Sequence, residues 1–130
     1  MNQKVLGSVV EYMTLENNLR LEILDASRPI AGDRWLVHLV ARVTVPLSPE
    51  ILQNVPNGEL LEREFGGAIE YVSEMKKHFV DKKDRDAVFK RFTDVVHNEK
   101  KPYLSHLKFA ERLVLRRLAE LKRDKPQLFM

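Results

Sequence analysis

The sequence changes its hydrophobic period near Pro46, and this change constrains the fold more than any other feature. Before Pro46, apolar residues alternate with polar ones, which is the pattern of half-buried strands. After it, apolar residues recur every three or four positions, which is the pattern of helices that bury one face. Consecutive strands with no helix between them pair antiparallel, because parallel pairing needs a long crossover. The pattern therefore predicts an α+β domain, an antiparallel sheet of about three N-terminal strands packed against three or four C-terminal helices.

Three N-terminal segments carry the strand pattern, and the last of them is expected at the centre of the sheet. They are residues 5–13, 18–25 and 34–45. In residues 18–25 apolar and charged side chains alternate, so one face is buried and the other is wet. In residues 34–45 both faces hold apolar side chains, which is typical of a strand covered on both sides. Residues 25–34 are rich in Asp, Arg, Ser, Pro and Gly and are predicted to form the polar tip of a hairpin.

The later periodicity predicts helices at residues 48–54, 59–80, 84–98 and 102–125. Ser48 followed by Pro49 is a typical helix start. Gly66 and Gly67 interrupt the second helix, where each glycine costs about 1 kcal/mol relative to alanine. We expect this helix to begin after the two glycines, although a kink or the close approach of another chain would also account for them.

The chain is expected to form one domain, residues 1–130, with a β-sheet part at 1–46 and a helical part at 47–130. No repeat or long linker divides it. Its 130 residues contain no cysteine, which favours a reducing compartment. The N-terminus does not have the pattern of a signal peptide, and no apolar stretch is long enough to span a bilayer. We therefore expect a cytoplasmic protein that has no membrane partner.

The sequence disfavours an enzyme, although it does not decide the matter. Glu74 and His78 lie four residues apart on the predicted helix 59–80, and His38 is expected close to Glu22 across the hairpin. Both pairs are explained by a solvated surface. No nucleophile elbow, phosphate-binding loop or zinc motif is present. We expect no catalytic residue, no metal and no cofactor.

The last predicted helix is the most informative about function. Its expected docking face consists of Leu107, Ala110, Val114, Leu118 and Leu121. A second apolar pair, Phe109 and Leu113, lies beside a basic stripe, and it must be covered by the rest of the chain or by another molecule. The charge is also uneven: residues 1–75 hold 6 Lys and Arg against 11 Asp and Glu, and residues 76–130 hold 16 against 8. This asymmetry either attracts a charged partner or remains solvated.

Two functional hypotheses follow. The first is a non-catalytic interaction or adaptor module that forms homo-oligomers, or binds an acidic protein, through its last helix. Phe109 and Leu113 would be its apolar anchors, and Arg112 and Arg116 would select the partner. The alternative is RNA or DNA binding with little sequence preference. Its predicted site is the stripe of Lys108, Arg112, Arg116 and Arg123, extended by lysines at 76, 77, 82, 83, 100 and 101.

Overall fold

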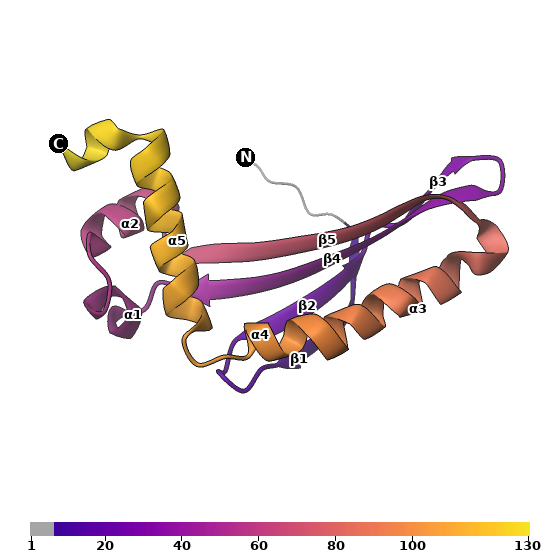
Figure 1. Ribbon diagram of the computed structural model, residues 1–130, viewed down its shortest axis with the longest axis horizontal. Helices are drawn as coiled ribbons and strands as arrows, with labels where there is room; N and C mark the ends of the chain where they lie inside the picture. Colours follow the sequence, from indigo (N-terminus) through magenta and orange to yellow (C-terminus); the bar gives the residue numbers. More distant parts are fainter. Residues whose placement is uncertain (1–6) are drawn as a thin grey trace.

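The computed structural model describes residues 7–130 as a five-stranded antiparallel sheet with helices packed on one face and at one end (Figure 1). The strands are β1 (Ser8–Thr14), β2 (Arg20–Asp25), β3 (Arg28–Ala31), β4 (Arg34–Pro46) and β5 (Ala68–Asp81). β4 pairs with β2 and β3 along one edge and with β5 along the other. The predicted α+β class is therefore confirmed, with five strands in place of about three.

β4 is the central strand, as its sequence predicts, because both of its faces are apolar. The face toward the helices is fully buried at Val37, Leu39, Ala41, Val43 and Val45. The predicted hairpin joins β2 and β4, but its turn is shorter than residues 25–34. Only Gly32 and Asp33 form the turn, with Gly32 at φ +58°, because β3 continues the pairing with β4 up to Ala31.

The predicted helix over residues 59–80 is wrong. Helix α2 (Gly58–Phe65) follows a short helix, α1 (Pro49–Gln53), and ends at Gly66, whose φ is +75° and whose N–H donates to the carbonyl of Glu62. The chain then continues as the long strand β5. The two glycines therefore end the helix instead of preceding it. The apolar residues of β5 fit both periods, and pairing with the central strand decides between them.

The helix predicted at 84–98 is present and longer than predicted. It follows a 3₁₀ turn, η1 (Lys82–Asp84), and runs as α3 (Arg85–Val95), a π-helical turn, η2 (Val96–Lys100), and α4 (Lys101–Leu104). Pro102 therefore does not begin the last helix. In a regular α-helix its ring would clash with the carbonyl of Asn98, and the wider π turn accommodates it. No helix within residues 7–130 is long and apolar enough to cross a membrane.

The last helix, α5 (Phe109–Asp124), closes the main hydrophobic core and is followed by a 3₁₀ turn, η3 (Pro126–Phe129). In Figure 1 it crosses the ends of β4 and β5 next to α1 and α2, whereas α3 runs along the sheet toward the opposite end of the molecule. The largest core cluster joins the sheet to this helix through Ile23, Leu39, Val43, Phe109, Leu113 and Val114, among others. The core thus lies between the sheet and α5, and the far end of α3 and β5 is left to the surface.

Candidate functional site

The two predicted apolar anchors lie inside the protein. Phe109 is 2% exposed and Leu113 is 1% exposed, and both belong to the main core. The ring of Phe109 packs edge-on against Tyr71 of β5 and Tyr103 of α4. The chain itself therefore covers the second apolar face of the helix, so the role of this pair as surface anchors is corrected. Leu107, which was assigned to the docking face, is instead 81% exposed because it precedes α5.

The predicted basic stripe on α5 is on the surface but largely occupied by local partners. Lys108 lies 3.8 Å from Glu111, and Arg123 lies 3.0 Å from Asp124. The hydrogen bond from Arg123 holds the pKa of the Asp124 carboxyl below its usual value. Arg116 donates to the hydroxyl oxygen of Tyr103 at 3.0 Å, and this bond raises the pKa of its guanidinium. Within residues 7–130, Arg112 is the member of the stripe that contacts no carboxylate or hydroxyl group.

The predicted acid–base pairs have different partners in the structure. His38 Nε2 lies 2.6 Å from Glu74 Oε1 across β4 and β5, and Glu22 instead accepts from Arg42 at 2.7 Å. Glu74 and His78 lie on a strand, so the helical i,i+4 relation between them does not exist. The part of the chain that is described contains no group of three or more residues able to hold a metal.

The polar residues of the hairpin do not form an anion-binding loop. Asp25 and Ser27 lie between β2 and β3, away from the turn. The carboxylate of Asp25 accepts from the Ser27 N–H at 2.9 Å, and the Ser27 hydroxyl accepts from the His38 N–H at 3.0 Å. These side chains serve the local backbone, as the sequence predicts for this segment.

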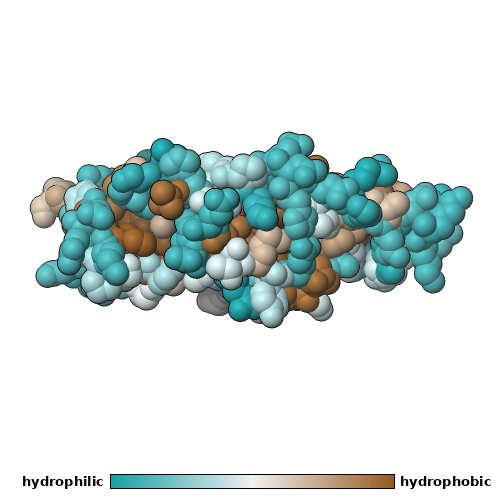
Figure 2. Space-filling view, turned by 90° about the horizontal axis from the view of Figure 1, so that it is seen from below, coloured by the Kyte–Doolittle hydropathy of each residue, from teal (hydrophilic) through white to brown (hydrophobic). Residues whose placement is uncertain are grey.

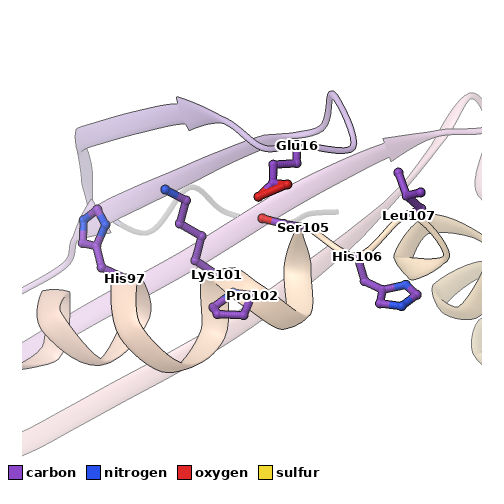
Figure 3. Close-up of a pocket in the computed structure, with 7 residues that line it drawn as sticks. All are labelled: Glu16, His97, Lys101, Pro102, Ser105, His106 and Leu107. Atoms are coloured by element: carbon purple, nitrogen blue, oxygen red, sulfur yellow. The ribbon is translucent and has the colours of Figure 1, made fainter.

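A pocket between the β1–β2 turn and the end of α4 brings together charged groups of both signs (Figure 3). Its lining includes Glu16, His97 and Lys101, and His97 is also paired with Glu11 at 3.0 Å. Figure 3 shows the side chain of His106 pointing away from that of Lys101. The groups therefore do not converge on one point, and the pocket has no arrangement typical of a catalytic centre.

Phe79, near the end of β5, has the most unusual conformation in the described chain. The register between β4 and β5 shifts so that His78 and Phe79 both lie opposite Leu36, which makes a β-bulge. Phe79 has φ +57°, a left-handed conformation that is a genuine outlier for a bulky residue. Its side chain is nevertheless 67% exposed. The bulge thus directs an aromatic ring into solvent.

Three cations surround this ring. Lys77 comes from β5, Lys83 from η1 and Arg91 from α3, and all three line one surface pocket with Phe79. Within residues 7–130, none of the three forms an ion pair with a carboxylate. We call Phe79, Lys77, Lys83 and Arg91 the Phe79 surface.

The geometry of the fold brings these residues together although they are spread over three elements. The Lys82 N–H donates to the carbonyl of Asp33 at 2.9 Å, which fixes η1 against the β3–β4 turn. At the pocket, which has a volume of about 500 Å³, Arg34 pairs with Asp81 at 3.3 Å. Asp84 is then the one carboxylate of this pocket without an ion pair in the described part of the chain, against three free cations. The pocket therefore favours an anion.

The Phe79 surface was missed as a unit because Phe79 was assigned to the buried face of a helix. The local sequence contained a signal: residues 76–85, KKHFVDKKDR, place one aromatic residue among five Lys and Arg. Comparison with known proteins adds no information, since no family model, no curated protein and no solved structure matches the chain.

Proposed function

We propose that this protein is a non-catalytic module that binds single-stranded nucleic acid, with little sequence preference, through the Phe79 surface. The observation that carries the proposal is an exposed aromatic ring, held by a strained bulge, among three unpaired cations. Proteins that bind single strands combine aromatic side chains, on which bases stack, with cations that contact phosphates. Stacking of this kind tolerates every base, and it requires a base that is not already paired in a duplex.

The character of the surface supports a polar ligand. Figure 2 shows one long face of the molecule, on which hydrophilic side chains dominate and apolar side chains gather in separate areas. With Phe109 and Leu113 in the core, the α5 face no longer has the anchors on which the self-association hypothesis depended. A reducing, cytoplasmic location, which we propose from the absence of cysteine, would give the module access to RNA.

The test is fluorescence anisotropy of labelled single-stranded RNA, single-stranded DNA and duplex DNA at low and moderate salt. We expect the single strands to bind with a dissociation constant of about 1–100 µM and to weaken steeply as salt rises. Stacking contributes about 1–3 kcal/mol per base, so Phe79→Ala should weaken binding roughly tenfold.

Tyr12→Ala is the matched control, because Tyr12 is another exposed aromatic residue, 62% accessible on β1, with Arg20 above its ring. It should leave binding unchanged. Absence of binding at low salt, or equal losses in the two variants, would contradict the proposal. Binding of an acidic peptide in preference to the oligonucleotides would assign the surface to a protein partner.

A further inference from the structure

We infer that the bound strand continues from the Phe79 surface along α3 to a second contact at Tyr103, Arg112 and Arg116, so that the ligand is a polymer of several nucleotides. This inference rests on the proposed function and specifies the ligand of the same site.

The second contact repeats the composition of the first. Tyr103 is 42% exposed, and its ring is fixed by Phe109 at 5.4 Å and Tyr71 at 6.5 Å between ring centroids. Its hydroxyl accepts from Arg116, and Arg112 lies one helical turn before Arg116 on the same side of α5. An aromatic ring that is partly exposed and held in place therefore lies beside two cations.

Both contacts lie on the side of the α3–α4 run that faces β5. At one end, Arg91 lines the pocket with Lys77 and Phe79 of β5. At the other end, Tyr103 contacts Tyr71 of β5. Arg117 of α5 also donates to the carbonyl of Glu70 at 2.8 Å, so α5 adjoins the same strand. One strand of the sheet thus connects the two contacts.

The opposite side of α3 does not favour an anion. Its pocket is lined by Asp25, Asp86 and Asp94 together with Arg85 and Lys90. Arg85 pairs with Asp86 and Lys90 pairs with Asp94, each at 3.3 Å. The cations on that side are neutralised locally, so the free positive charge lies on the side that faces β5.

The spacing of the two contacts fits a short single strand. Twelve residues separate Arg91 from Tyr103, which at about 1.5 Å per residue is roughly 18 Å. Stacked nucleotides advance about 3.4 Å each, so the distance corresponds to about five nucleotides. A ligand of four nucleotides would reach one contact, and a ligand of eight would reach both.

The experiment measures anisotropy of fluorescein-labelled oligothymidylates of 4, 8 and 12 nucleotides. We expect the 8-mer and the 12-mer to bind at least tenfold more tightly than the 4-mer. Combined Arg112→Gln and Arg116→Gln should remove this advantage and leave the 4-mer affinity unchanged. The matched control is combined Lys122→Gln and Arg123→Gln, which removes the same charge from the same helix and should change neither.

The outcomes separate the two proposals. If no oligomer binds the wild-type protein, the proposed function fails. If binding depends on Phe79 but not on length, and the Arg112 and Arg116 variant matches wild type, the inference fails and the proposed function stands. Equal losses in the variant and its control would reveal a diffuse charge effect and would also overturn the inference.

Discussion

At the scale of single residues, Phe79 has an energetic cost that the fold does not repay. A left-handed conformation costs a residue with a side chain about 1–2 kcal/mol, and a ring that is 67% exposed gains little from burial. Strain that brings no packing gain is typical of positions that contact a ligand. The conformation of Phe79 and its exposure therefore support the same conclusion from independent observations.

This strain predicts an inverted order of stability. Phe79→Gly should be more stable than Phe79→Ala by about 1 kcal/mol, because only glycine adopts φ near +57° without cost. In an ordinary strand alanine would be the better of the two. Urea unfolding of both variants measures the difference, while both should lose oligonucleotide binding to the same extent. An alanine variant as stable as the glycine variant would show that the strain is absent in solution.

At the scale of elements, Gly66 determines where α2 ends and β5 begins. It has φ +75° and ψ −137°, a conformation that is essentially restricted to glycine. Gly67 has no positive φ and has open space around it. Gly66→Ala should therefore destabilise the protein by about 1–3 kcal/mol, and Gly67→Ala should change stability by less than about 1 kcal/mol. Thermal or urea unfolding tests the pair, and equal effects would contradict this role of Gly66.

The same element shows how far the sequence alone determined the fold. The strands before Pro46, the Ser48 cap of α1 and the α+β class were predictable, because local periodicity and capping carry them. β5 was not, since its apolar residues satisfy a helical period and only pairing with β4 selects the strand. The candidate site depended on that pairing: a bulge exposes Phe79, and a helix that follows it supplies Arg91. The lysines were visible in the sequence, but their grouping around one ring was not.

At the scale of the whole molecule, the excess positive charge of residues 76–130 is distributed unevenly around α3. The side facing β5 holds Lys77, Lys83 and Arg91 without ion pairs in the described chain, whereas the cations of the other side are paired. A net charge of +3 would give only weak, diffuse attraction if it were spread over the surface. Concentration along one side gives a polyanion a defined path, and the number of phosphates on that path is measurable.

The salt dependence of binding counts these phosphates. Each phosphate of a single strand that is neutralised contributes a slope of about −0.7 to a plot of log K against log salt concentration. A 12-mer that reaches all the cations at 77, 83, 91, 112 and 116 should therefore give a slope of about −3.5, and a 4-mer bound at the Phe79 surface should give about −2. Glutamine at positions 112 and 116 should reduce the 12-mer slope to that of the 4-mer, because the lost contacts are those of the second station alone. A slope near zero for the wild-type protein would mean that stacking without phosphate contacts holds the strand, and the path along α3 would then have no electrostatic basis.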